Sequence, residues 1–354
     1  MRHRAISIFA LFIAVVASSF PVHAQEANLD FLNHNQPILD AHNCYPYEGQ
    51  WNNRIQRALD SGFPVSIEQD LAWYVDPVTH KGRVVVSHTP HPTGSEPTLE
   101  DYFFKQVTPI IKKAIAENKR SQWPVIVLHF DFKDNQTALL QAVWQILGQH
   151  EEWLSTAVKT SNPNELSPID RQPILVVTEE ADEQQKVFYD VLPVGARLRL
   201  FGSAHTRAAP QNMTREQQVH WAVTATPEEL VIGKPTNYRR WWNGTWYQVE
   251  EGGEPHAGDW NTADNKRLKS LVDYAHSMGY WVRFYALDGF APAEDQGWGQ
   301  SYNFGSREAV VLRWKAAIAA GVNFIATNQY EELATYLKQD AKNLRPAPSS
   351  AKVK

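Results

Sequence analysis

Short β-rich runs and amphipathic stretches alternate along nearly the whole chain. The β-rich runs predict strands, at 37–42, 64–71, 83–88, 125–132, 174–178, 197–202, 230–233, 280–286 and 322–327. Apolar residues spaced at i, i+3 and i+4 predict helices, at 50–61, 98–118, 135–148, 181–190, 262–278, 306–320 and 330–339. Strands that alternate with helices in this way imply parallel βαβ units.

The number of strands favours a (βα)8 barrel of the TIM type. The runs 64–71 and 83–88 are close enough to form one hairpin-like excursion, which leaves eight crossover strands. No internal repeat or flexible linker divides 25–342, so we expect an α/β barrel that forms a single domain. The longest irregular stretch, 203–261, is expected to be a functional loop or to contain short elements of its own.

The two ends of the chain are expected to lie outside this barrel. Arg2 and Arg4 precede an almost wholly apolar run at 5–20, and Val22-His23-Ala24 is typical of a cleavage site. Residues 1–24 therefore predict a signal peptide and a secreted or periplasmic protein. The polar stretch 343–354 is predicted to be a flexible C-terminal tail.

The charge balance narrows the range of partners. The chain has 34 basic and 39 acidic residues, and without 1–24 the count becomes 32 against 39, a formal charge of −7. A chain with this charge is not expected to bind nucleic acid. The single cysteine, Cys44, excludes an internal disulfide. It raises the alternative of a Cys–His nucleophile with His42, but a small buried thiol is the favoured interpretation.

Polar residues interrupt two of the predicted strands on one face. Glu68 and Asp70 lie two residues apart in 64–71, so their side chains share a face. Neighbouring carboxylates repel each other unless a positive charge neutralises them. A bound divalent cation is one explanation, and a solvated pair at a strand end is the other.

The strand 125–132 favours the first explanation, because it carries His129, Asp131 and Lys133 on one face. Buried charges need partners, and Asp131 can supply a third carboxylate oxygen. Together, Glu68, Asp70 and Asp131 predict a site for one divalent cation, Mg²⁺ or Ca²⁺, between which three such ligands do not discriminate.

Two histidines complete the candidate site. His42 ends the strand 37–42, and His88 ends the strand 83–88. Active sites of barrel enzymes lie at the carboxyl ends of the strands. Since imidazoles exchange protons near neutral pH, His42 and His88 are the candidate catalytic residues.

The order of these motifs resembles the phosphatidylinositol-specific phospholipase C-like phosphodiesterases, a barrel superfamily that includes glycerophosphodiester phosphodiesterases and sphingomyelinases D. The motifs that carry the resemblance are His42-Asn43, Glu68-Gln69-Asp70, His88 and Asp131-Phe132-Lys133. Weaker support comes from Ala326-Thr327-Asn328, which is similar to the closing strand of glycerophosphodiesterases.

This resemblance implies a secreted, metal-dependent phosphoric diester hydrolase, or a lyase of the phospholipase C type. His42 would act as base and His88 as acid. Asn43, Lys133 and Arg283 would bind or orient the phosphate. The implied substrate is a phosphodiester small molecule or a lipid headgroup, and no obligate protein partner is implied.

Three alternatives remain open at this point. The aromatic stretch 238–247 suits contact with a lipid headgroup or a membrane surface, but equally the packing that caps a barrel. The paired carboxylates and the many tryptophans also fit a metal-independent glycosidase. A non-catalytic barrel that only binds a ligand would retain the same fold.

Overall fold

The computed structural model describes residues 36–46, 52–251, 258–294 and 303–343. The predicted signal peptide therefore lies outside the described residues, as does all of the predicted tail except Asn343. Within the described residues, no helix has the length and apolarity needed to cross a membrane.

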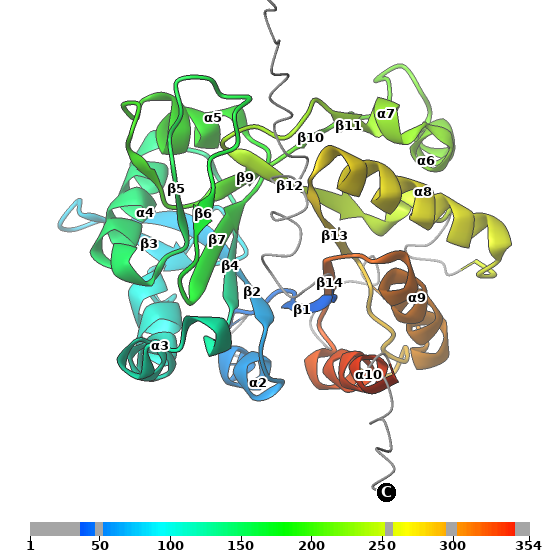
Figure 1. Ribbon diagram of the computed structural model, residues 1–354, viewed down its shortest axis with the longest axis horizontal. Helices are drawn as coiled ribbons and strands as arrows, with labels where there is room; N and C mark the ends of the chain where they lie inside the picture. The colour runs from blue at the N-terminus through cyan, green and yellow to red at the C-terminus, as the bar shows by residue number, and fades with distance from the viewer. Residues whose placement is uncertain (1–35, 47–51, 252–257, 295–302, 344–354) are drawn as a thin grey trace, which may run out of the picture.

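Eight parallel strands close into a barrel around which the helices are arranged (Figure 1). β1 pairs in parallel with β14 on one side and with β2 on the other, which closes the ring. The barrel strands, in chain order, are β1 (Ile38–Ala41), β2 (Val65–Val75), β4 (Ile126–Phe132), β7 (Ile174–Thr178), β9 (Phe201–Ser203), β12 (Arg239–Thr245), β13 (Trp281–Tyr285) and β14 (Phe324–Thr327). The predicted TIM-type barrel is confirmed.

Most of the outer helices fall where the apolar periodicity places them. They are α2 (Arg54–Asp60), α3 (Lys105–Glu117), α4 (Thr137–Gln149), α5 (Asp182–Gln185), α8 (Thr262–Met278), α9 (Arg307–Ala320) and α10 (Tyr330–Asn343). The caps explain the sharp limits of α8. Asn261 accepts a hydrogen bond from the Ala263 amide, and Gly279 takes the left-handed conformation that ends the helix.

The second and third predicted strands form a hairpin, as the sequence indicated. β3 (Gly82–Val86) pairs antiparallel with the distal half of β2, with Leu71 opposite Val86. β3 therefore runs back toward the barrel and returns the chain to its mouth.

The sixth barrel strand was predicted wrongly. The run 230–233 forms β11 (Val231–Ile232), which pairs with β10 (His205–Thr206) outside the barrel. The barrel strand is instead β12, within the stretch expected to be irregular. Its sequence, RRWWNGT, lacks a β-branched run, and tertiary contacts stabilise it because Arg239 donates to the carbonyl oxygens of Glu180 and Ser203.

The fifth barrel strand is also shifted from the predicted run at 197–202. Only its end belongs to β9, whereas Arg197 and Leu198 form β8, the edge of a small sheet with β5 (Thr156–Val158) and β6 (Ile169–Asp170). Two further helices, α6 (Arg215–Thr224) and α7 (Pro227–Leu230), lie in the stretch expected to be irregular.

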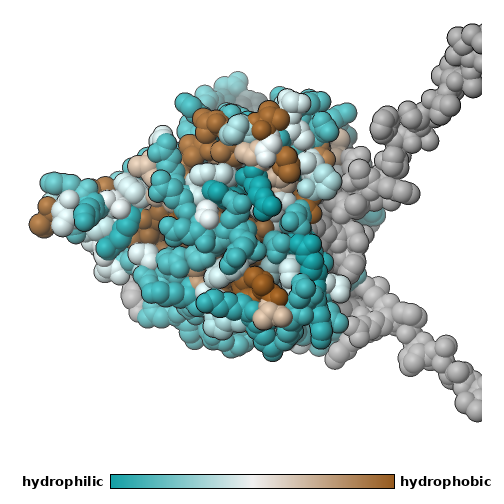
Figure 2. Space-filling model, turned by 60° about the vertical axis from the view of Figure 1, so that its left-hand side comes forward, coloured by the Kyte–Doolittle hydropathy of each residue, from teal (hydrophilic) through white to brown (hydrophobic). Residues whose placement is uncertain are grey.

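The aromatic stretch 238–247 belongs mainly to the core. The side chains of Tyr238, Trp241, Trp242 and Trp246 are buried. Of the two alternatives for this stretch, packing within the protein therefore accounts for these four rings. The face of the molecule in Figure 2 is mostly hydrophilic, with hydrophobic side chains in small groups.

Candidate active site

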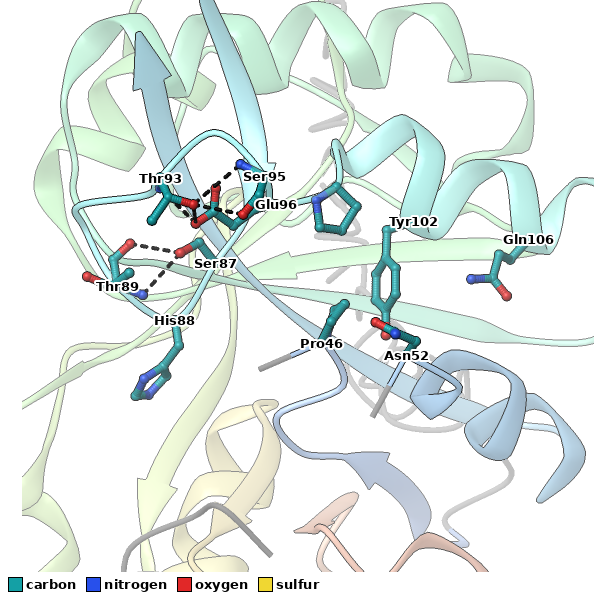
Figure 3. Close-up of a pocket in the computed structure, with 11 residues that line it drawn as sticks. Pro46, Asn52, Ser87, His88, Thr89, Thr93, Ser95, Glu96, Tyr102 and Gln106 are labelled. Carbon is teal, nitrogen blue, oxygen red and sulfur yellow. Dashed lines mark hydrogen bonds between the residues drawn. The ribbon is translucent and has the colours of Figure 1, made fainter. Parts of the chain in front are cut away.

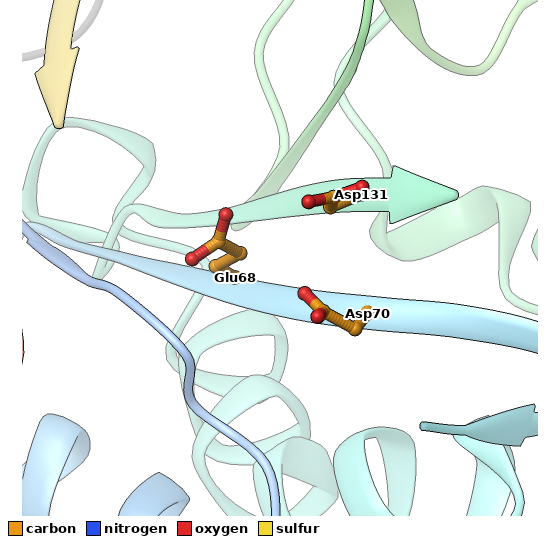
Figure 4. Close-up of side chains that lie close together, drawn as sticks. All are labelled: Glu68, Asp70 and Asp131. Atoms are coloured by element: carbon orange, nitrogen blue, oxygen red, sulfur yellow. The ribbon is translucent and has the colours of Figure 1, made fainter. Parts of the chain in front are cut away.

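Three carboxylates meet at the carboxyl end of the barrel, as the sequence predicted. Asp70 on β2 lies opposite Asp131 on β4 in the strand register. Each of these residues and Glu68 offers a carboxylate oxygen, and these oxygens lie within 4.8 Å of one another (Figure 4). Glu68 and Asp70 are buried, and Asp131 is partly exposed.

The Lys133 ammonium lies between two of these carboxylates. Its Nζ is 2.7 Å from Asp70 Oδ2 and 2.8 Å from Asp131 Oδ2. Their charges raise the pKa of Lys133 although burial opposes this. Burial, reinforced by the charge of Asp131, still raises the pKa of Asp70 well above its usual value. One ammonium therefore does not fully neutralise the cluster.

Arg283 lies inside the barrel and is committed to other protein groups. Its Nε donates to Asp40, its Nη1 donates to Asn243 Oδ1 at 3.0 Å, and its Nη2 donates to Glu68 Oε1 at 3.3 Å. The side chain is only 3% exposed. This geometry differs from the phosphate-binding role implied by sequence, since every nitrogen of the guanidinium already has a protein acceptor.

A buried histidine and a glutamate extend this network on the opposite side of Glu68. His129 Nε2 lies 2.7 Å from Glu179 Oε1, and its Nδ1 lies 3.7 Å from Glu68 Oε1. These carboxylates raise the pKa of His129 although burial and Arg283 oppose its charge. Asn243 Nδ2 donates to both oxygens of Glu179, at 3.1 and 3.0 Å.

The charges of this network fit a divalent cation. It joins five carboxylates to three cationic groups, and when all are ionised two negative charges remain. The carboxylates are those of Asp40, Glu68, Asp70, Asp131 and Glu179, and the cations are Lys133, Arg283 and protonated His129. Buried carboxylate oxygens are the ligands that Mg²⁺ and Ca²⁺ prefer, so the cluster fits either metal.

His42 follows β1 and lies against the cluster. Its Nε2 is 3.6 Å from Glu68 Oε2. Burial and the charge of Arg283 lower its pKa well below the usual value. Asn43 Nδ2 contacts His42 Nδ1 at 3.1 Å, and the Asn43 backbone N–H donates to Glu68 Oε2 at 2.8 Å. Asn43 therefore orients both His42 and Glu68.

Hydrogen bonds to neighbouring residues fix the orientation of the side-chain amides of Asn43 and Asn328, so that the nitrogen of each faces His42. Asn328 Nδ2 donates to Asp288 Oδ2 at 2.5 Å, and its Oδ1 accepts from Arg54 at 2.8 Å. Asn43 Oδ1 accepts from the Tyr45 hydroxyl at 2.6 Å, which leaves Asn43 Nδ2 to face the ring. The neutral His42 ring consequently accepts at Nδ1 and carries its proton on Nε2.

His88 reaches the mouth by way of the hairpin. The backbone N–H of Ser87 donates to Asp70 O at 2.9 Å. His88, the next residue, therefore lies beside β2, the strand that carries Glu68 and Asp70. The His88 ring stacks on Tyr45 at 5.9 Å between centroids. Partial burial and the charge of Lys133 lower its pKa. Unlike His42, His88 is exposed.

A polar hollow of about 750 Å³ opens at His88 (Figure 3). Its lining includes the hydroxyl and amide groups of Ser87, Thr89, Thr93, Ser95, Tyr102 and Gln106, together with the Glu96 carboxylate and two prolines. Cys44, by contrast, is fully buried, and burial raises the pKa of its thiol to about 12. The interpretation of Cys44 as a small buried thiol is therefore supported by its surroundings.

Sequence reasoning missed several members of the network, although some signals were present. Asp40 lies two residues before His42 and shares its face of β1, and His129 lies two residues before Asp131 on β4. Asn243 and Glu179 carried no such signal. Asn243 lies in the unrecognised strand β12, and Glu179 directly follows β7, a strand with no charged residue.

Removal of the Arg283 charge is expected to destabilise the protein strongly. Arg283→Met leaves Asp40 buried without a cation, and breaking such a pair typically costs about 3–5 kcal/mol. Urea unfolding of Arg283→Met measures the loss in free energy. The double variant Arg283→Met, Asp40→Asn should recover part of it, and a single variant as stable as the parent would contradict this role.

Comparisons with known proteins are limited to solved structures. No protein-family profile matches the sequence, and no curated protein matches it significantly. The fold is similar to a glycerophosphodiester phosphodiesterase from Parabacteroides distasonis, with 11% identity over 87% of this chain and 98% of that one and a TM-score of 0.42. It is also similar to a calcium-dependent phosphoinositol-specific phospholipase C from a Pseudomonas species, with 14% identity, 84% and 90% coverage and a TM-score of 0.43.

Other solved structures with different names reach a comparable similarity. An HPPK-DHPS protein from Plasmodium falciparum, in a structure with pteroate, is 11% identical over 90% of this chain and 50% of that one, with a TM-score of 0.45. The structural neighbours thus include a glycerophosphodiester phosphodiesterase and a phosphoinositol-specific phospholipase C. At these values the likeness is one of fold, and the chemistry has to be argued from the site.

Proposed function

We propose that this protein cleaves phosphodiester bonds with the help of one divalent cation. The observation that carries this proposal is the convergence of Glu68, Asp70 and Asp131 within 4.8 Å, with His42 in contact with Glu68. The two uncompensated negative charges of the network support a cation with two positive charges. When bound there, such a cation supplies Lewis-acid chemistry, since it offsets negative charge on a phosphoryl oxygen.

Lys133 supports the same assignment. Its ammonium contacts Asp70 and Asp131, and its side chain is 17% exposed. A phosphate group that approaches these carboxylates meets a positive charge at their edge. We assign Lys133 to binding and neutralising this phosphate. Arg283, inside the barrel, neutralises Asp40 and Glu68.

The two histidines have different roles: His88 accepts a proton, and His42 stabilises developing negative charge. His42 is neutral at pH 7 because its pKa is low, and its proton is on Nε2, on the side of Glu68. A neutral imidazole held in this way donates a hydrogen bond to an oxygen that gains negative charge. The exposed His88 also has a lowered pKa, so its unprotonated ring accepts the proton of the attacking hydroxyl. His88 is therefore the base, the reverse of the role that the resemblance implied, and the leaving alkoxide takes its proton from solvent.

The substrate class follows from the surroundings of His88. Hydroxyl and amide groups line the adjoining hollow, which suits a polar alcohol such as a glycerol unit or a lipid headgroup. With the predicted signal peptide, this gives an enzyme that acts outside the cytoplasm. If the attacking hydroxyl belongs to water the enzyme is a hydrolase, and if it belongs to the substrate the enzyme is a lyase that forms a cyclic phosphate.

The direct test is an assay of the purified mature protein. Bis-p-nitrophenyl phosphate, glycerophosphodiesters, phosphatidylinositol and lysophospholipids serve as substrates, and p-nitrophenyl glycosides test the rival glycosidase. Phosphodiester cleavage that is lost in Asp70→Asn supports the proposal, and phosphorus NMR of the products separates hydrolysis from cyclisation. Cleavage of glycosides alone, or ligand binding without any turnover, would overturn it.

A further inference from the structure

A second hollow, of about 370 Å³, opens at the carboxyl end of the barrel beyond Asn243. Strand β12, the loop after β7, and β10 with the residues that follow it contribute one wall, and helix α6 contributes the other. Figure 1 shows α6 and α7 on the same side of the molecule as β10 and β11. The residues that give this hollow its chemistry are Glu180, Thr206, Arg207, Arg215, Trp221 and Tyr247.

The two arginines in this hollow have no polar partner in the part of the chain that the structure describes. Apart from Arg171, every other arginine described there has a hydrogen bond or an ion pair through its guanidinium. Arg207 and Arg215 are the exceptions, and both are exposed. Arg215 only lies over the Tyr247 ring, with its guanidinium carbon 5.8 Å from the centroid.

Glu180 and Thr206, which also line the hollow, are already engaged. Glu180 Oε2 accepts from the Thr206 backbone N–H at 2.6 Å, and Thr206 Oγ1 accepts from Trp242 Nε1 at 2.9 Å. Glu180 is the only carboxylate in the lining. Two guanidinium groups against one engaged carboxylate give the hollow a net positive charge, although the whole chain is acidic.

The position of this hollow connects it to the carboxylate network. Thr245, which lines it, lies two residues after Asn243 on β12, and Asn243 contacts Glu179 and Arg283. Residues two apart share a face of a strand and are separated by roughly 7 Å. The hollow therefore lies next to the side of the network formed by Asn243 and Glu179.

We propose that this hollow binds a second anionic group of the substrate, a phosphate monoester, while the scissile phosphodiester lies at the carboxylate cluster. Arginine recognises phosphate oxygens through paired N–H donors, and Arg207 and Arg215 together offer such donors to one group. The inference rests on the proposed function, because it names the substrate class of that same site as a phosphodiester with an additional phosphate.

Binding of inorganic phosphate tests the hollow without any turnover. Isothermal titration is carried out on the mature protein in EDTA, so that no metal contributes. Binding should persist in Lys133→Met, which changes the other phosphate contact, and in Arg120→Gln, an exposed arginine before β4 at the other end of the barrel. It should weaken about tenfold or more in Arg207→Gln, Arg215→Gln. No binding, or unchanged binding in the double variant, would overturn the inference.

A kinetic comparison identifies the source of the phosphate. Glycerophosphoglycerol is compared with its terminal phosphate monoester, and phosphatidylglycerol with phosphatidylglycerol phosphate in phosphatidylcholine vesicles. A preference for the soluble monoester identifies a free phosphodiester, and one confined to vesicles identifies a lipid headgroup. For the free phosphodiester and for the lipid headgroup alike, the double variant Arg207→Gln, Arg215→Gln should raise KM for the monoester about tenfold and leave kcat unchanged. No preference in either pair would refute the inference, whereas phosphate binding without any turnover would refute only the proposed function.

Discussion

Removal of divalent cations with EDTA is expected to reduce phosphodiesterase activity by about 10³-fold, and added Mg²⁺ or Ca²⁺ is expected to restore it. The reason is the two negative charges left in the network of Glu68, Asp70 and Asp131, which repel an anionic substrate unless a cation is bound. Lewis-acid stabilisation of a phosphoryl transition state is worth several kcal/mol. The measurement is kcat/KM after dialysis against EDTA and after titration with each metal, which also identifies the preferred ion.

Substitution of single carboxylates separates metal loss from unfolding. Asp70→Asn and Asp131→Asn should bind the metal more weakly in calorimetric titration. Asp76→Asn, which changes a partly exposed acid in the loop between β2 and β3, should not. Because burial raises the pKa of Asp70, its ionised form disfavours folding above the unfolded pKa of about 3.9. Asp70→Asn should therefore unfold no more easily than the parent in EDTA, and activity that survives full metal removal would refute the metal site.

The barrel could be predicted because its strands and helices each carry a strong local pattern. Helix α8 coincides with the predicted 262–278, since the capping side chain of Asn261 and the terminal Gly279 are readable in the sequence. Strand β12 was missed because its stability comes from partners far away in the chain. Trp241 packs on His129, and Arg239 is bound by carbonyl oxygens of other strands.

The contrast between local sequence patterns and distant contacts also explains which residues of the site could be predicted. The carboxylates were predictable because Glu68 and Asp70 share one strand face and Asp131 lies on a second strand with the same polar pattern. The function of Arg283 was not predictable. An arginine on a strand suits either a substrate phosphate or a buried acid, and only the closed structure brings Asp40 within its reach. Which groups neutralise each other inside a barrel therefore depends on pairings that no local pattern encodes.

Replacement of either histidine is expected to reduce kcat by about 10²- to 10⁴-fold, because His88 accepts a proton and His42 donates a hydrogen bond to developing negative charge in the transition state. The variants are His42→Gln and His88→Gln. His91→Gln is the matched control, because His91 is an exposed histidine three residues beyond His88 in the same loop. Circular dichroism and urea unfolding check that each variant is folded. Full activity in folded His42→Gln or His88→Gln would exclude the assigned role.

The pH dependence distinguishes His88 as the proton acceptor from His88 as a residue that only shapes the pocket. Partial burial and the Lys133 charge lower its pKa below the usual 6.5. Since only the unprotonated ring accepts a proton, kcat/KM should fall as the pH decreases through that lowered pKa and stay level above it. In His88→Gln the residual activity should lose this acidic limb, while His91→Gln should keep it. An acidic limb with the same midpoint in His88→Gln would assign the titration, and with it the role of base, to another group.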